Sequence, residues 1–124
     1  HVERAFFMLA GKVWGTTRAV LRSPFVSVDH LHILPQSRCS LHVHDHKANL
    51  FLVLTGRLSV IVEKNDYALV DVTELGPGQW TIVWPGEYHR FETGVDNAEA
   101  IEVYFPQPVG EDIRRKDVGG RSQG

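Results

Sequence analysis

The stretch "LFLVLTGRLSVIVE" (Leu50–Glu63) shows the residue pattern that recurs along the chain. It consists of two apolar, partly β-branched runs that meet at Thr55 and Gly56, which is typical of two strands joined by a bend. Similar runs occur at Phe25–Leu34, Tyr67–Leu75, Trp80–Trp84, His89–Thr93 and Ile101–Phe105. About nine candidate strands at roughly 8 to 12 residue spacing predict an all-β sandwich or barrel rather than alternating helices and strands.

The two ends of the chain depart from this pattern. Glu3–Trp14 has the composition for a short helical turn, although Gly11 would interrupt it. The tail from Arg114 is polar and glycine-rich, and we expect it to fray unless another segment holds it. We therefore predict one domain, with an N-terminal arm and edge strands (1–24), a barrel core (25–105) and a partly flexible C-terminal extension (106–124).

Composition excludes several classes of protein. The 124 residues are 43% hydrophobic and 23% charged, which is ordinary for a globular domain. A net charge of −2 gives no electrostatic footprint for nucleic acid or an anionic membrane surface. No apolar run approaches the roughly 20 residues of a membrane span, and no signal peptide pattern follows "AFFMLA". Cys39 is the only cysteine, so an internal disulfide is excluded and a cytoplasmic location is expected.

A histidine-rich stretch, "SLHVHDHKANLF" (Ser40–Phe51), leads into the strand expected from Leu50. On a strand His42 and His44 face the same way, so their ring nitrogens can converge on one cation. On a helix they would lie roughly 200° apart. Imidazole binds zinc, iron, manganese, nickel or copper, so the ligand type does not name the metal. Alone, this pair is a weak signal, and solvent-facing histidines are the alternative.

The downstream spacing strengthens the metal hypothesis. The pattern His42-x-His44-x4-Asn49-x6-Gly56 is followed by Gly78-x5-Trp84-x-Gly86-x2-His89. This double motif resembles that of the cupin superfamily and covers about Pro35–Phe105. The resemblance implies a double-sheet jelly roll, with His42, His44, Asn49 and His89 around one divalent metal ion inside the barrel. His46 falls outside the motif and is expected in solvent or behind the ligands; His30 and His32 are expected on the surface or the wall.

Asn49 stands where the cupin motif usually has glutamate. An amide oxygen is neutral and binds divalent ions more weakly than a carboxylate. Two interpretations follow: a three-histidine metal site with open positions, or a weak metal site in a barrel that only binds a small molecule. We favour the first, because three nitrogen ligands suffice for zinc or iron.

The segments around the double motif resemble one particular family within the cupin superfamily. "KVWGTTRAVL", "LPQSRCSLHVHDHKANLFLVLTGRLSV" and "IEVYFPQPVGEDIRRKDVGGR" make nearly the whole chain similar to the type II phosphomannose isomerase domain. His42, Lys47 and Asn49 replace that family's Gln, Arg and Glu, and Gly119 replaces the tyrosine before its final Gly-Arg. The resemblance implies metal-dependent aldose–ketose isomerisation of a sugar phosphate, and a homodimer.

Such an isomerisation needs a Lewis acid, a base that moves a proton between adjacent carbons, and cations for the phosphate. The candidate catalytic residues are Glu102, from the matching "IEV", and Arg121, from the matching terminal arginine. Candidate substrate-binding residues are Lys47, Arg90 and Arg115 for the phosphate, with Trp84 and Tyr88 for the sugar. For each of these, a solvated or packing role is the alternative.

Two other functions stay open. Three histidines with open positions also suit an iron oxygenase, and a barrel pocket without metal suits a non-catalytic sugar-binding module. Metal content separates the binding module from the two enzymes, and oxygen uptake separates the enzymes from each other.

Overall fold

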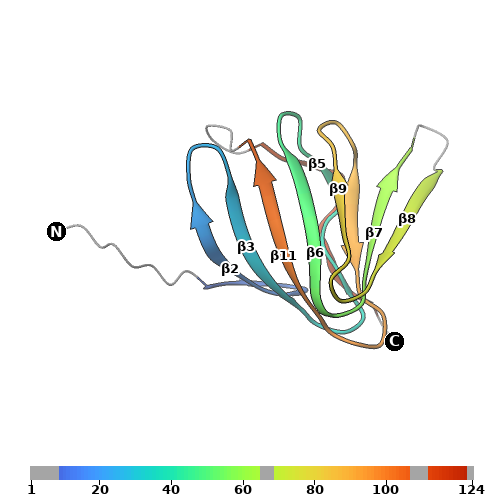
Figure 1. The fold of residues 1–124 in the computed structure, drawn as a ribbon. Helices are drawn as coiled ribbons and strands as arrows, with labels where there is room; N and C mark the ends of the chain where they lie inside the picture. The colour runs from blue at the N-terminus through green and yellow to red at the C-terminus, as the bar shows by residue number, and fades with distance from the viewer. Residues whose placement is uncertain (1–8, 65–68, 107–111, 123–124) are drawn as a thin grey trace.

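The computed structural model describes residues 9–64, 69–106 and 112–122. Within these ranges all regular elements are β-strands in two antiparallel sheets, so the all-β prediction is confirmed (Figure 1). No helix in this part of the chain is long and apolar enough to cross a membrane. The six-stranded sheet runs in the order β1 (Leu9–Lys12), β2 (Gly15–Arg22), β3 (Ser27–Ile33), β11 (Ala98–Phe105), β6 (Ala48–Gly56) and β9 (Trp80–Val83).

The second sheet carries the shorter strands. Its order is β12 (Arg114–Arg115), β5 (His42–Val43), β10 (His89–Glu92), β4 (Ser37–Arg38) and β13 (Gly120–Arg121). β7 (Leu58–Glu63) pairs with β10 and also with β8 (Val70–Leu75), and these two strands lie at the side of the molecule in Figure 1. The two sheets face each other and form the jelly roll.

Strand β11 lies at the centre of the six-stranded sheet, between β3 and β6. Alternate side chains of β11 are buried, which directs Glu102 to the interior. In the ladders Glu102 lies opposite Asp29 of β3 and Phe51 of β6. A buried row across three strands therefore contains two carboxyl groups.

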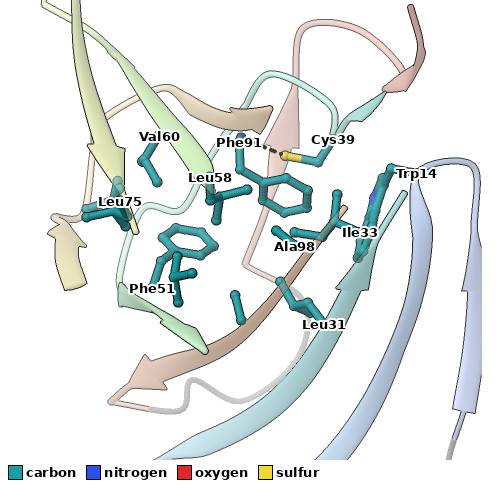
Figure 2. Close-up of a cluster of buried hydrophobic side chains, with 13 residues drawn as sticks. Trp14, Leu31, Ile33, Cys39, Phe51, Leu58, Val60, Leu75, Phe91 and Ala98 are labelled. Carbon is teal, nitrogen blue, oxygen red and sulfur yellow. Dashed lines mark hydrogen bonds between the residues drawn. The ribbon is translucent and has the colours of Figure 1, made fainter. Parts of the chain in front are cut away.

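The apolar core fills one part of the interior (Figure 2). Phe91 lies at its centre, with ring centroids 4.9 Å from Trp14 and 6.0 Å from Phe51. The Phe91 N–H donates to Cys39 Sγ at 3.2 Å. The remaining members are Leu31, Ile33, Val53, Leu58, Val60, Leu75, Val83, Ala98 and Ala100. Burial of these side chains is the main favourable term for the fold.

Both ends of the described chain are held in sheets. The helical turn expected within Glu3–Trp14 is not formed over Leu9–Lys12, because those residues pair as β1 with β2; the residues before Leu9 lie outside the described ranges. After Trp14 the chain turns at Gly15, whose φ is +153° and where a Cβ would collide with the carbonyl oxygen of His32. At the other end, the tail from Arg114 is held by pairing of β12 with β5 and of β13 with β4.

Candidate metal centre

Three histidines from the two predicted motifs meet inside the barrel. His42 of β5 lies opposite His89 of β10 in the ladder, and His44 follows His42 by two residues. One ring nitrogen from each histidine lies within 4.8 Å of the other two, and all three residues are buried. The structure therefore brings together the three histidines that the motif spacing predicted as ligands.

Each imidazole is oriented by a backbone carbonyl. The Nδ1 atom lies 2.7 Å from the Ser40 oxygen in His42, 2.6 Å from the Asp112 oxygen in His44, and 2.9 Å from the Glu87 oxygen in His89. A carbonyl oxygen only accepts hydrogen bonds, so each Nδ1 carries the proton and each Nε2 keeps its lone pair. Metal-bound histidines are usually held by such a partner on the other ring nitrogen.

The electrostatic state of the three rings suits a cation. Burial, with the neighbouring His89 and His44, lowers the pKa of His42 to about 3. Burial lowers the pKa of His89 to about 4 and also lowers that of His44. Neutral imidazole is the form that binds metal. The buried Nε2 of His44 has no hydrogen-bond partner among the described residues, so this donor set fits a divalent cation.

Asn49 joins this triad to a carboxyl group. Its Nδ2 donates to Glu102 Oε2 at 3.0 Å and lies 3.4 Å from His89 Nε2. The Asn49 Oδ1 is buried and, within the described residues, has no hydrogen-bond partner. The predicted ligand Asn49 therefore lies beside the triad and bridges it to Glu102.

Glu102 is buried at the side of the triad. Burial raises its pKa to about 7, against the opposing effect of hydrogen bonds from Tyr104 and Asn49. The Tyr104 ring packs edge-on against His44 at 5.3 Å, and Lys47 Nζ lies 3.9 Å from the centre of the same ring. A carboxyl group that can gain or lose a proton near neutral pH therefore lies one amide away from the histidines.

A cavity of about 580 Å³ opens beside these groups. The polar side chains in its wall include His42, Ser40, Glu102, Tyr104, Asp29, Lys12, Arg22 and Arg115. The Arg22 guanidinium donates to Asp29 Oδ1 at 2.7 Å and to the carbonyl oxygens of Leu21 and Val28. The cavity thus combines a histidine, carboxyl groups and cations in one space, of the size of pockets that bind small molecules (roughly 300–1,000 Å³).

Comparison with known families agrees with this site. The family model described as "Mannose-6-phosphate isomerase C-terminal" matches residues 3–117. The chain belongs to this family. The mannose-1-phosphate guanylyltransferase of Klebsiella pneumoniae is 29% identical over 111 residues, and the alginate biosynthesis protein AlgA of Pseudomonas fluorescens is 30% identical over 112 residues. These matches cover 87% and 88% of this chain but only 22% of either relative.

Solved structures confirm the cupin fold of this chain. Oxalate decarboxylase from Bacillus subtilis superposes with a TM-score of 0.77 at 16% identity, over 89% of this chain and 30% of that chain. The structure of CapF with an inhibitor superposes with a TM-score of 0.79 at 16% identity, over 90% and 34%. At this identity the likeness concerns the fold.

Two of the predicted substrate-binding residues lie near the triad. Arg115 lines the cavity and lies opposite His42 in the ladder between β12 and β5. Lys47 lies over Tyr104, as described above. The exposed His46 lies outside the triad, and its N–H donates to Asp112 Oδ2 at 2.8 Å.

The structure does not bring the other predicted residues to the cavity. Arg90 follows His89 on β10, points to the opposite face and pairs with Glu92 at 3.1 Å. The exposed Arg121 donates to the carbonyl oxygen of Pro35 at 3.4 Å. Trp84 is 56% exposed, and the Tyr88 ring lies 4.2 Å from Lys116 Nζ.

Sequence reasoning gave no role to Asp112, Tyr104 or the Arg22–Asp29 pair, which all contact the site. Asp112 lies within the "GEDI" segment of the family resemblance, so a signal existed but carried no role. Tyr104 follows Glu102 by two residues and shares its face, which strand alternation predicts. The pairing of Arg22 with Asp29 depends on the register of β2 against β3 and has no signal in the sequence.

Proposed function

We propose that this domain is a metal-dependent aldose–ketose isomerase that acts on a sugar phosphate, with mannose 6-phosphate as the first substrate to test. The observation that carries this proposal is the buried Glu102 carboxyl, which lines the same cavity as His42 of the triad and is linked to the triad through Asn49. The family name gives the substrate class. The chain spans about a fifth of the length of its curated relatives, so their whole activity is not transferred to it.

His42, His44 and His89 would hold the metal through Nε2. A bound divalent cation, whether zinc, iron, manganese or nickel, supplies Lewis acidity toward the carbonyl and hydroxyl oxygens of a sugar. The protein's part is to keep the proton on Nδ1 and the lone pair on Nε2 of each ring, which the carbonyl partners of Nδ1 do; in His89 this Nε2 lies 3.4 Å from Asn49 Nδ2. Asn49 adds no charge to this set of side chains.

Glu102 is the proposed base. Its Oε atoms would take a proton from one substrate carbon and return it to the neighbouring carbon, as isomerisation through an enediol requires. Asn49 Nδ2 donates to Oε2, and the Tyr104 hydroxyl donates to the same carboxyl group. A pKa near 7 lets the same group serve in both proton transfers.

The cations in the cavity wall would bind the phosphate. Arg22 donates to Asp29, and Lys12 and Arg115 line the same cavity. Guanidinium and ammonium groups are the usual partners of phosphate oxygens. This proposal keeps the predicted Arg115 for the anionic end of the substrate and adds Lys12 and Arg22, which line the same cavity.

A second candidate, a sugar-binding module without catalysis, is favoured by one observation. Asn49 replaces the usual glutamate, so the four predicted ligands, the three histidines and Asn49, include no carboxylate. Three imidazoles and an amide bind a divalent ion less strongly than a set with a carboxylate.

Elemental analysis of the purified protein tests the proposal, with the His89→Ala and Asn49→Glu variants beside the wild type. We expect about one zinc, iron, manganese or nickel ion per wild-type chain, and loss of this metal in His89→Ala. The metal-loaded protein should then convert mannose 6-phosphate to the ketose phosphate, and Glu102→Gln should lower the rate by about 100-fold or more.

The alternatives give other results. Metal found only in Asn49→Glu would indicate that the wild type is a binding module. Oxygen consumption by the iron-loaded protein, without isomerisation, would indicate the oxygenase. Rate loss in Glu102→Gln without change in metal content separates the base from the metal site.

We also propose a homodimer. Among the described strands, β8 pairs only with β7, and five of its six residues are exposed, including Val70 and Val72. A second copy would cover this edge, and exposed strand edges commonly pair with another chain. Light scattering over a concentration series that gives only monomer would contradict this.

A further inference from the structure

The segment that begins at Asp112 runs along the edge of the strand that carries the first histidines. Strand β12 pairs with β5, with Arg115 opposite His42. The Lys116 N–H then donates to the Leu41 carbonyl oxygen at 2.8 Å. The C-terminal segment thus borders the first histidine motif on the side away from β10, although it follows that motif by about 70 residues of chain.

The Asp112 carboxylate binds the backbone directly after His44. Its Oδ1 accepts the Asp45 N–H at 2.9 Å, and its Oδ2 accepts the N–H groups of His46 at 2.8 Å and Lys47 at 3.1 Å. Three consecutive peptide N–H groups that converge on one anion form a nest, a geometry that fixes the conformation of the loop. Asp112 is 7% exposed, so water does not replace these bonds readily.

The same residue also orients His44. The Asp112 carbonyl oxygen accepts the Nδ1–H of His44 at 2.6 Å. The Nε2 of this ring is the buried nitrogen that has no hydrogen-bond partner among the described residues. Asp112 therefore holds the ring through its main chain and the backbone next to that ring through its side chain.

We infer that Asp112 is a positioning residue of the histidine site: its carboxylate fixes loop 45–47 and thereby keeps its own carbonyl against His44 Nδ1. The inference rests on the proposed function, because it assigns the fixed Nε2 to metal binding. Without the carboxylate, the loop and the Asp112 main chain move relative to each other, and His44 loses its fixed tautomer. Groups that orient a ligand typically change metal affinity by about 10- to 100-fold when they are replaced.

Asp45 offers a matched control. Its side chain forms a two-bond ion pair with Arg114, at 3.0 Å and 2.8 Å, between the same two segments. This pair is exposed, and exposed ion pairs hold a structure only weakly. Asp45→Asn therefore removes a side-chain link between the segments but keeps the Asp45 N–H bond to Asp112.

The first measurement is a titration of Co²⁺ into metal-free wild type, Asp112→Asn and Asp45→Asn, followed by visible absorption. We expect Asp112→Asn to bind Co²⁺ about 10- to 100-fold more weakly with an altered spectrum at saturation, and Asp45→Asn to stay within about twofold of wild type. Circular dichroism of the metal-free proteins checks that each is folded. If Asp112→Asn does not fold, Asp112→Ser, whose hydroxyl can accept one N–H, takes its place.

The second measurement needs no metal. ¹⁵N NMR of the histidine side chains reports which ring nitrogen carries the proton. We expect Nδ1–H for His44 in wild type and Asp45→Asn, and a mixture of tautomers in Asp112→Asn. Wild-type Co²⁺ affinity and tautomer in Asp112→Asn would overturn the inference while the proposed function stands. Absence of Co²⁺ binding by wild type would end the proposed function, and the His44 tautomer would then decide the inference alone.

Discussion

The interior of this barrel has two halves, one polar and one apolar, and the same strands supply both. On three of these strands a polar residue of the site is followed, two positions later and on the same face, by an apolar residue of the core. The pairs are Asp29 and Leu31 on β3, Asn49 and Phe51 on β6, and His89 and Phe91 on β10. On β11 the order is reversed, with Ala100 before Glu102.

This difference separates what stabilises the fold from what the site requires. The apolar half gains free energy from removal of hydrocarbon from water. The polar half buries three imidazoles and a carboxyl group, which costs free energy unless each polar atom has a partner. The inner faces of both sheets therefore have a stabilising part and a costly part, two residues apart along the same strands.

The largest effect should come from the apolar half. Leu58 is 1% exposed in the core, and Leu58→Ala should lower the free energy of unfolding by about 2–5 kcal/mol, because it removes buried methyl groups and leaves a cavity. Urea denaturation measures this loss. Val95→Ala, at a residue that is 80% exposed, should change stability by less than about 0.5 kcal/mol. Equal losses in the two variants would contradict the assignment of the core.

Acid should destabilise the polar half of the metal-free protein. The folded pKa values of about 3 for His42 and about 4 for His89 lie below 6.5, so between pH 6.5 and about 4 the unfolded chain binds protons that the folded chain does not. Stability is therefore present above pH 6.5 and falls as the pH falls, by about 1.4 kcal/mol per pH unit for each group.

The test is urea denaturation from pH 7 to pH 5 in the presence of a chelator. His42→Gln should show a shallower pH dependence than wild type, and the same replacement of the exposed His46 should not change it. An unchanged slope in His42→Gln would show that His42 is not buried as a neutral ring.

The third effect should be a gain in stability. The pKa of Glu102 is raised from 4.5 to about 7, so its contribution to stability is complete below pH 4.5 and is lost as the pH rises through 7. Glu102→Gln removes this loss and should stabilise the metal-free protein at pH 8 by up to about 3 kcal/mol, with a much smaller change at pH 5. A variant that is less stable than wild type at pH 8 would contradict the burial cost of Glu102.

Much of this arrangement follows from the sequence. Alternation in an extended chain aims His42 and His44 the same way, and the resemblance to the cupin motif implies His89 as their third partner. The same rule directs the Arg90 side chain away from the histidines, because Arg90 is adjacent to His89 and points to the other face of β10.

The contacts with Asp112 could not be predicted in this way. They join residues 65 to 68 positions apart, and no local period determines which backbone groups a returning segment will meet. The expectation for the tail was likewise conditional, since a polar, glycine-rich segment is ordered only by what it pairs with. Tertiary register, rather than residue type, decides both.

The position of β11 has a consequence for synthesis of the chain. This strand separates β3 from β6 in the sheet, although both precede it in the sequence by some 40 residues or more. Until Ala98–Phe105 has left the ribosome, β3 and β6 each present an open edge and the sheet cannot close. The nascent domain must therefore wait for nearly its last strand, and the interval before then is when a chaperone, or a neighbouring nascent chain, would meet its unpaired edges.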